Sequence, residues 1–186
     1  MSGAAYISSD DSALLRRALQ GRAGGACLEI GAGNGGTLID LAKRFETAAG
    51  TDLRRPGMGD WSGGASFSLA DRATCFRDSV FDLVAFNPPY LGGEGYGDVA
   101  VDGGEGLEAP ASFLEEALRV VKKEGSVVFL LNDEADIAGY EEACGRHGFR
   151  LRVVASKRLF FEALSVYEAV SAEDAGHPGS PSDGEG

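Results

Sequence analysis

A buried strand that runs directly into a glycine-rich turn and then into a helix limits the fold of this chain more than any other feature. The apolar run over residues 26–30 has the length and composition of a buried strand. In such a unit, the turn between the strand and the helix has a backbone that a ligand can approach closely. Glycine turns join many strands to helices, so this one alone does not identify a ligand. The turn is Gly31-Ala32-Gly33-Asn34-Gly35, and the helix face that follows is Leu38, Leu41, Ala42 and Phe45.

The other periodic segments repeat this alternation of strands and helices. It predicts an α/β, Rossmann-like fold of about seven strands, mostly parallel. The last two strands are joined too tightly for a helical crossover, so the last strand should run antiparallel. Further strands are expected over residues 47–51, 66–70, 81–86, 126–131, 149–155 and 163–169. Further helices are lined by Leu14, Leu15, Ala18 and Leu19, by Phe113, Leu114, Ala117, Leu118 and Val121, and by Ala135, Ile137, Ala138, Ala143 and Cys144. The second of these has Pro110 at its start and Gly125 past its end.

The charge of the chain is strongly acidic, with a formal net charge of −12. Residues 171–186 hold four acids and no Lys or Arg, and they are poor in apolar groups. We expect residues 1–170 to form one domain and residues 171–186 to be a disordered tail. The domain still carries −8, which disfavours binding to phosphate backbones. A local basic patch remains possible at Arg146, Arg150, Arg152, Lys157 and Arg158.

The cysteines and the hydropathy pattern concern the cellular setting. Cys27, Cys75 and Cys144 are odd in number and far apart, so neither a disulfide framework nor a structural metal site is indicated. No apolar run approaches the roughly 20 residues that a membrane-spanning helix needs. The first twenty residues do not resemble a signal peptide. A cytoplasmic protein is the expectation.

Acidic residues at successive strand ends predict a nucleotide site around the glycine turn. Asp52 ends the strand after the turn, where a carboxylate can accept hydrogen bonds from ribose hydroxyls. Asp71 follows the next strand and could accept from an adenine amino group. Glu29 can face a positively charged ammonium group. The segment from Gly31 to Gly36 also fits G-x-G-x-x-G, so spacing does not separate S-adenosylmethionine from a dinucleotide.

The tetrapeptide Asn87-Pro88-Pro89-Tyr90 directly follows the strand expected over residues 81–86. Two prolines fix the backbone and remove two N–H donors. The acceptors that remain are the Asn87 side-chain oxygen and the Pro88 carbonyl, which match the two protons of an NH₂ group. Tyr90 offers a flat surface for a planar group. The arrangement favours methyl transfer to an amide or amine nitrogen, helped by hydrogen bonds that strengthen in the transition state.

With these motifs the chain resembles class I S-adenosylmethionine-dependent methyltransferases, and among them the HemK-like protein-glutamine methyltransferases. The resemblance covers most of residues 6–170. It is closest to the short archaeal and eukaryotic branch. The segments that carry it are 6–12, the cofactor loop 28–35, the tetrapeptide 87–90, the glycine segment 102–107 and the closing strand 162–166.

The resemblance implies an activity and a set of site residues. The cofactor would be S-adenosylmethionine, with S-adenosylhomocysteine as its product. The target would be the glutamine amide in the Gly-Gly-Gln loop of a class I translation termination (release) factor. The implied catalytic residues are Asn87, Pro88 and Tyr90, and the implied substrate-binding residues are Asn87, Pro88, Pro89 and Tyr90. The implied cofactor-binding residues are Glu29, Gly31, Gly33, Gly35, Asp52, Leu53, Asp71 and Asn87.

The resemblance also implies a partner, and one segment departs from the family. Relatives in the short branch are activated by a small zinc-binding subunit that adds a strand to the sheet edge. The strand expected from Ser66 to Ala70 should lie at an edge, preceded by Met58 and Trp61, so a heterodimer is expected there. The family usually has a helix between Asp52 and Asp71, but residues 53–65 show no apolar period. The glycine-rich residues 91–107 are expected to form a mobile lid.

Other functions share parts of this pattern. An adenine-N6 methyltransferase of DNA or RNA also needs a forked acceptor for an NH₂ group, together with a basic channel that the acidic chain does not favour. A non-catalytic nucleotide-binding module would not need the intact tetrapeptide at Asn87. A nicotinamide-dependent oxidoreductase is the weakest alternative, because no substrate domain is evident.

Overall fold

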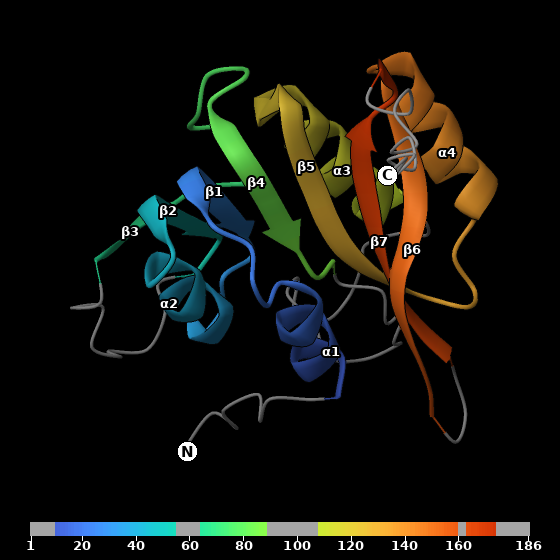
Figure 1. Cartoon of the computed structure of the whole chain (residues 1–186), viewed down its shortest axis with the longest axis horizontal. Helices are drawn as coiled ribbons and strands as arrows, with labels where there is room; N and C mark the ends of the chain where they lie inside the picture. The colour runs from blue at the N-terminus through green and yellow to red at the C-terminus, as the bar shows by residue number, and fades with distance from the viewer. Residues whose placement is uncertain (1–9, 55–63, 89–107, 160–162, 174–186) are drawn as a thin grey trace, which may run out of the picture.

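The computed structural model of the protein describes residues 10–54, 64–88, 108–159 and 163–173. These residues form one seven-stranded sheet with the order β3-β2-β1-β4-β5-β7-β6 (Figure 1). The strands are β1 (Gly24–Ile30), β2 (Phe45–Asp52), β3 (Ala65–Leu69), β4 (Phe81–Phe86), β5 (Val121–Asn132), β6 (Phe149–Arg158) and β7 (Ala163–Ser171). The described helices are α1 (Asp10–Ala18), α2 (Gly36–Ala42), α3 (Glu108–Val120) and α4 (Ile137–Arg146).

Strand direction follows the prediction from the sequence. Strands β3, β2, β1, β4 and β5 pair in parallel. Strand β7 lies between β5 and β6 and is antiparallel to both, so the mostly parallel sheet with an antiparallel last strand is confirmed. The strand order runs outward from β1 to β3 and then reverses at β4. Open α/β sheets bind ligands beyond the strand ends at such a switch point, here between β1 and β4.

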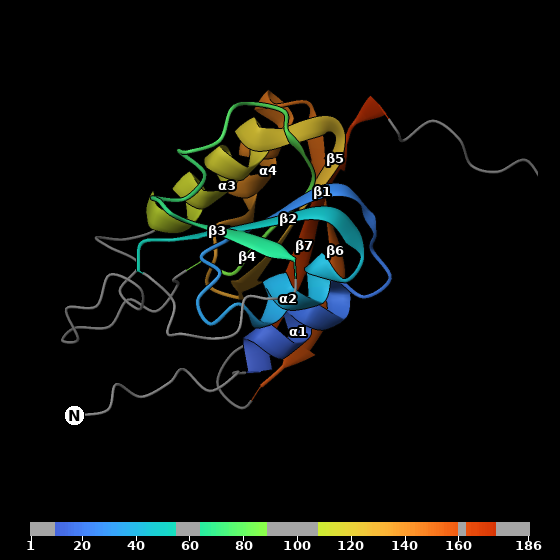
Figure 2. The same cartoon turned by 90° about the vertical axis from the view of Figure 1, so that its left-hand side faces the viewer.

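Two layers of helices cover the two faces of the sheet. Figure 2 shows α3 and α4 on one side and α1 and α2 on the other. Alternate strand residues point to opposite faces, so Leu28 packs into the core under α3 and α4 while Cys27 packs into the core with α1 and α2. Phe129 of β5 stacks on Phe86 of β4 and on Tyr140 of α4, with ring centroids 5.0 and 5.7 Å apart. This packing on both faces makes the strand ends rigid positions for a site.

Two helix ends differ from the expectation. The sequence pattern extends the second helix to Phe45, but α2 ends at Ala42 and Phe45 begins β2. Phe45 is buried in the same core as the helix stripe, so its spacing imitates a further helical turn. Val121 likewise begins β5 instead of ending α3, and Gly125 lies within β5.

Gly125 is required by strand packing and does not mark the end of a helix. A Cβ atom at this position would lie 2.7 Å from Val121 Cγ2, 2.8 Å from the Asp82 carbonyl oxygen and 3.0 Å from the Phe81 carbonyl oxygen. The ladder between β4 and β5 shifts register beside it. A glycine within a strand often marks such a close approach of two backbones.

The described chain continues past the predicted domain boundary at residue 170. Ser171 is the buried last residue of β7, and the Ala172 N–H donates to the Gly148 carbonyl over 2.9 Å. Glu173 forms an ion pair with Lys123 at 2.9 Å. The rest of the expected tail, residues 174–186, lies outside the described residues. Within the described ranges, no helix has the length and apolar character to cross a membrane.

Candidate functional site

The register of the central strands brings two predicted site residues to one edge of the sheet. Ile30, the last residue of β1, pairs with Thr51 on β2 and with Phe86 on β4. The next residues on these neighbouring strands are Asp52 and Asn87. They therefore flank the glycine turn that follows β1, at the switch point of the sheet.

The glycine turn has a backbone that only glycine adopts freely. Gly31, Gly33 and Gly35 have φ angles of 72°, 52° and 77°, in the left-handed region where a Cβ atom is costly. The Gly33 N–H donates to Asp52 Oδ2 over 2.9 Å, which ties the turn to the end of β2. Gly31 and Gly33 are exposed, so their backbone is open to a ligand.

Glu29 is a buried carboxylic acid beneath this turn, with 7% of its surface exposed. Burial raises the pKa of Glu29 to about 8, although hydrogen bonds from the Thr37 side chain and the Leu38 backbone favour the charged form. The negative charge of Asp52 also raises this pKa. Glu29 Oε2 is buried and has no hydrogen-bond partner among the described residues. A cationic group such as an ammonium would supply that partner and stabilise the carboxylate.

The end of β2 combines a carboxylate with exposed apolar surface. Asp52 Oδ1 accepts from the Arg54 N–H over 3.0 Å. The next residue, Leu53, is 55% exposed, and Leu69, which pairs with Asp52 in the β2–β3 ladder, is 65% exposed. A carboxylate beside an apolar surface suits a ribose joined to a flat base. Leu53 and Asp52 therefore lie next to each other at the end of β2, beside the glycine turn.

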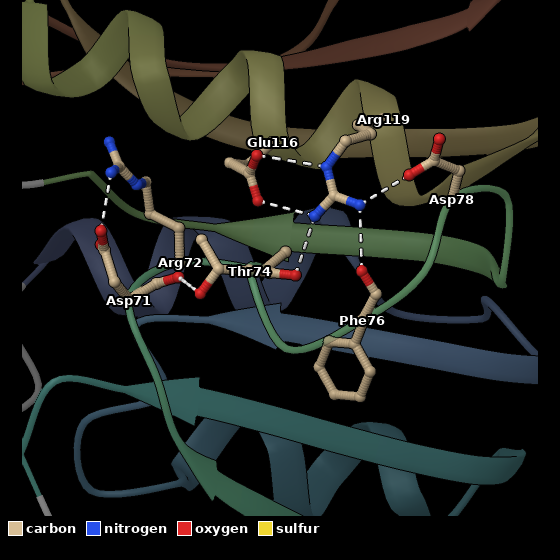
Figure 3. Close-up of polar contacts among 8 residues, drawn as sticks. Asp71, Arg72, Thr74, Phe76, Asp78, Glu116 and Arg119 are labelled. Atoms are coloured by element: carbon tan, nitrogen blue, oxygen red, sulfur yellow. Dashed lines mark hydrogen bonds and ion pairs between the residues drawn. The ribbon is translucent and has the colours of Figure 1, made fainter.

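Asp71 lies in a loop after β3 that is held tightly against α3. Arg119 of α3 donates to the Ala73 and Phe76 carbonyls over 3.0 and 2.9 Å and forms ion pairs with Glu116 and Asp78 (Figure 3). The carboxylates of Glu116 and Asp78 raise the pKa of Arg119. Asp71 pairs with Arg72 (Figure 3), with 2.7 Å between Asp71 Oδ2 and Arg72 Nη2. Arg72 has a φ of 49°, which marks a tight turn.

Asn87 presents an unsatisfied acceptor directly after β4. Its Nδ2 group donates to Asp11 Oδ2 over 2.9 Å. Its Oδ1 atom is buried and has no hydrogen-bond partner among the described residues. Pro88, the next residue, is buried. Pro89 and Tyr90 lie outside the described residues, as do the expected lid over residues 91–107 and both Met58 and Trp61.

Sequence reasoning did not assign a role to Asp11. This residue is in the first turn of α1 and is only 3% exposed, which is unusual for an aspartate. The available signal was its place in the segment 6–12 that resembles the start of the family domain. Nothing in the spacing connects residue 11 with residue 87, because that contact depends on the path of α1.

Two of the five cations in the basic patch considered from the sequence are paired with acidic side chains. Arg152 of β6 pairs with the buried carboxylate of Glu168, and Arg146 of α4 pairs with Glu115 at 2.6 Å and Glu142 at 3.2 Å. These pairs bind two of the five cations to acidic neighbours of the same molecule. They disfavour a phosphate-binding surface at this end of the sheet.

Comparisons with known proteins give structural matches only. No protein-family model matches the sequence, and the search of curated proteins finds no match. A chain of the Mtq2–Trm112 complex of E. cuniculi, responsible for methylation of the eRF1 translation termination factor, matches with a TM-score of 0.72 and 22% identity, over 90% of this chain and 98% of that chain.

Two further structures show the same likeness. Magnesium protoporphyrin IX methyltransferase of Synechocystis, solved with bound S-adenosylhomocysteine, has a TM-score of 0.64 and 12% identity, over 92% of this chain and 90% of that chain. Precorrin-6y C5,15-methyltransferase of Geobacter metallireducens has a TM-score of 0.60 and 14% identity, over 92% and 94%. The chain therefore has the α/β fold of S-adenosylmethionine-dependent methyltransferases.

Proposed function

We propose that this protein transfers a methyl group from S-adenosylmethionine to the side-chain amide nitrogen of a glutamine in a protein substrate. One observation carries the proposal: Asn87 Oδ1 is a buried acceptor without a partner among the described residues, one residue beyond β4 at the switch point of the sheet. A primary amide has two protons in one plane and can fill such an acceptor.

The polar and apolar groups around the glycine turn support this choice of cofactor. The unpartnered oxygen of Glu29 matches the ammonium group, Asp52 matches the ribose hydroxyls, and Leu53 matches one face of the adenine. When bound, S-adenosylmethionine supplies a methyl group on a positively charged sulfur. The residues that we propose to hold it are Glu29, Gly31, Gly33, Gly35, Asp52, Leu53, Asp71 and Asn87.

The protein's own contribution to the reaction is to hold and orient the nitrogen. Asn87 Oδ1 and the Pro88 carbonyl would each accept a hydrogen bond from one N–H of the amide, which leaves the nitrogen facing the cofactor. When the nitrogen takes the methyl group, S-adenosylhomocysteine is the leaving group and one N–H proton is released to water. As the nitrogen gains positive charge, both hydrogen bonds strengthen, and this lowers the barrier. An amide nitrogen is a poor nucleophile, so orientation supplies much of the rate. We propose that Pro89 and Tyr90 complete the substrate contact.

The likeness to the Mtq2–Trm112 structure supports a release factor as the substrate. That complex is responsible for methylation of eRF1, and the sequence resemblance to glutamine methyltransferases points to the Gly-Gly-Gln loop of such a factor. Asn87 would also accept from the amino group of adenine, so a DNA or RNA adenine-N6 methyltransferase is the alternative. The net charge of −12 and the paired Arg146 and Arg152 favour the protein substrate. A termination factor also suits the expected cytoplasmic setting.

A small zinc-binding subunit at the β3 edge is the proposed partner. Strand β3 has five residues and pairs only with β2 in the described sheet, so its other edge is open. Leu69 is 65% exposed there, whereas Phe67 packs against the protein's own core. Open edges pair readily with added strands. The Trm112 chain in the matched complex supports a partner of this kind.

Methylation with labelled S-adenosylmethionine tests the proposal. The purified protein, alone and with a candidate zinc-binding subunit, is incubated with a release factor, with the same factor carrying Gln→Ala in its Gly-Gly-Gln loop, and with single-stranded DNA and RNA. We expect label only on the intact factor, at the glutamine when the peptide is sequenced by mass spectrometry. Label on adenine and none on the factor would establish the alternative.

A further inference from the structure

Asp11 and Asn87 form a contact that the activity proposed above does not by itself require. Asp11 belongs to the first turn of α1, and Asn87 follows β4, 76 positions later in the chain. The Asn87 Nδ2 group donates to Asp11 Oδ2 over 2.9 Å, and Asp11 is 3% exposed. We propose that Asp11 is a positioning residue that fixes Asn87 with its oxygen facing the reactive nitrogen. The inference rests on the proposed function.

An asparagine side chain can present either of two ends to a site, and only one suits an NH₂ substrate. The oxygen accepts hydrogen bonds, whereas the Nδ2 group would meet the substrate donor with another donor. The two ends are nearly equal in size, so the hydrogen-bond partners decide the orientation. A carboxylate accepts and does not donate. Asp11 therefore pairs with Nδ2 of Asn87 and leaves Oδ1 to the site.

The position of Asp11 is itself fixed. Asp11 Oδ1 accepts from the Ser12 N–H over 2.7 Å, so both carboxylate oxygens are engaged. Helix α1 packs into the core through Leu15, which is 2% exposed. Just beyond its last turn, Arg44 donates to the Leu19 carbonyl over 2.8 Å and ties this end of the chain to the segment after α2. Asp11 is thus presented to Asn87 by a helix that is anchored in its middle and beyond its C-terminal end.

The contact also affects the strength of the acceptor. A hydrogen bond from Nδ2 to a carboxylate polarises the amide and places more negative charge on Oδ1 of Asn87. This added charge strengthens the hydrogen bond from the substrate most in the transition state, because the substrate nitrogen becomes positive there. Asp11 should therefore act on kcat and leave the affinity for the cofactor nearly unchanged.

Steady-state kinetics with a release factor as substrate test this role. Asp11→Ala should lower kcat about tenfold or more, as expected for loss of one charge-assisted hydrogen bond, with the Kd for S-adenosylhomocysteine within about twofold of wild type. Asp11→Asn keeps one of the two accepting oxygens but loses the charge, so it should recover only part of the rate. Arg17→Ala removes an exposed side chain of the same helix and is the matched control, with kcat unchanged.

A double-mutant cycle separates positioning from a general loss of structure. If Asp11 acts through Asn87, then Asp11→Ala combined with Asn87→Ala should be no slower than Asn87→Ala alone. Losses that multiply in the double variant would overturn the proposal. So would a loss of cofactor affinity in Asp11→Ala at unchanged kcat.

An NMR measurement on the ligand-free protein is independent of the substrate. The side-chain NH₂ resonances of Asn87 should show one proton protected from exchange in the wild type, and the protection should disappear in Asp11→Ala. Unchanged resonances would overturn the positioning role. If the protection is lost as expected but wild type does not methylate glutamine, the proposed function fails while the orientation of Asn87 by Asp11 stands.

Discussion

Single residues define the candidate site through acceptors that the protein leaves unsatisfied. Glu29 Oε2 and Asn87 Oδ1 are both buried without partners among the described residues. An unsatisfied buried polar group costs about 1–3 kcal/mol. Such groups in a folded protein call for an explanation, and ligand atoms that fill them are the simplest one. The two acceptors lie at the ends of the neighbouring strands β1 and β4, one suited to a cation and the other to an NH₂ group.

The raised pKa of Glu29 predicts how stability depends on pH. The folded protein holds the Glu29 proton up to about pH 8, whereas the unfolded chain releases it near the ordinary glutamate pKa of 4.5. Glu29 therefore contributes stability that is fully present below pH 4.5 and is lost as pH rises through about 8. Ligand-free wild type should lose more thermal stability than Glu29→Gln between pH 5 and 8, as measured by Tm. Parallel curves for both proteins would contradict the burial of a neutral acid.

The sequence predicted which residues lie at the ends of neighbouring strands. It did not predict contacts that depend on how a helix packs against the sheet. Asp52 was predicted beside the glycine turn, and its contact with the Gly33 N–H has that geometry, because neighbouring parallel strands end together. Asp11 could not be predicted, since its meeting with Asn87 depends on how α1 crosses the sheet. The proposed cofactor and catalytic roles of these residues remain predictions.

The helices and loops around the sheet hold these residues in place. Arg119 binds the loop after β3, which contains Asp71, to α3 through carbonyl and carboxylate acceptors (Figure 3). Helix α1 brings Asp11 against the end of β4. The glycine turn joins β1 to α2 and contacts β2 through Asp52. The described part of the site is therefore held by packed helices and strands and by loops bonded to them, as precise catalytic geometry requires.

The fold of these elements followed from periodicity, except where two periods coincide. Phe45 fits both the helical stripe of α2 and the first inward-facing position of β2. Because Phe45 is buried in the core that α2 also contacts, the spacing of apolar residues does not distinguish a helix from a strand there. Gly125 resembled a helix end because glycine is common there. Glycine is needed at residue 125 because β4 approaches β5 closely there. This contact joins strands far apart in sequence, so a local sequence pattern does not reveal it.

A pair of glycine substitutions tests that explanation. Gly125→Ala would place a Cβ atom within 3.0 Å of two β4 carbonyl oxygens and should destabilise the protein by about 1–3 kcal/mol. Gly145 lies within α4 with nothing within 4 Å of its Cβ position. Gly145→Ala should therefore stabilise it by about 0.5–1 kcal/mol. Urea unfolding measures both, and equal effects of the two variants would contradict this account.

The whole molecule has one fold, an acidic surface and two sheet edges of different character. The β3 edge is short and carries exposed Leu69 near the proposed cofactor site, whereas the ten-residue β6 edge carries Arg150, Arg152, Lys157 and Arg158. Lysine and other charges on an edge strand discourage further pairing. The β3 edge is therefore the better candidate for an added strand from a partner.

Matched substitutions at the two edges test the partner surface. Leu69→Asp should reduce capture of a co-expressed small zinc-binding subunit about tenfold, because it places a charge in an apolar contact. Val153→Asp changes an equally apolar residue, 55% exposed, on the β6 edge and should leave capture unchanged. Affinity pull-down with quantified bands gives both values. Equal capture by wild type and Leu69→Asp would exclude β3 as the docking edge.

The most direct test of the proposed activity is the rate of glutamine methylation by Asn87→Ala. The side chain is proposed to hold the substrate nitrogen through its unpartnered oxygen, so its loss should lower kcat about 100-fold or more, by analogy with loss of one oxyanion-type contact. Calorimetric titration should show that S-adenosylhomocysteine still binds, with a fall in affinity far smaller than the fall in kcat, because the other proposed cofactor contacts remain. Loss of cofactor binding with normal turnover per bound complex would contradict the role assigned to Asn87, and with it the central claim.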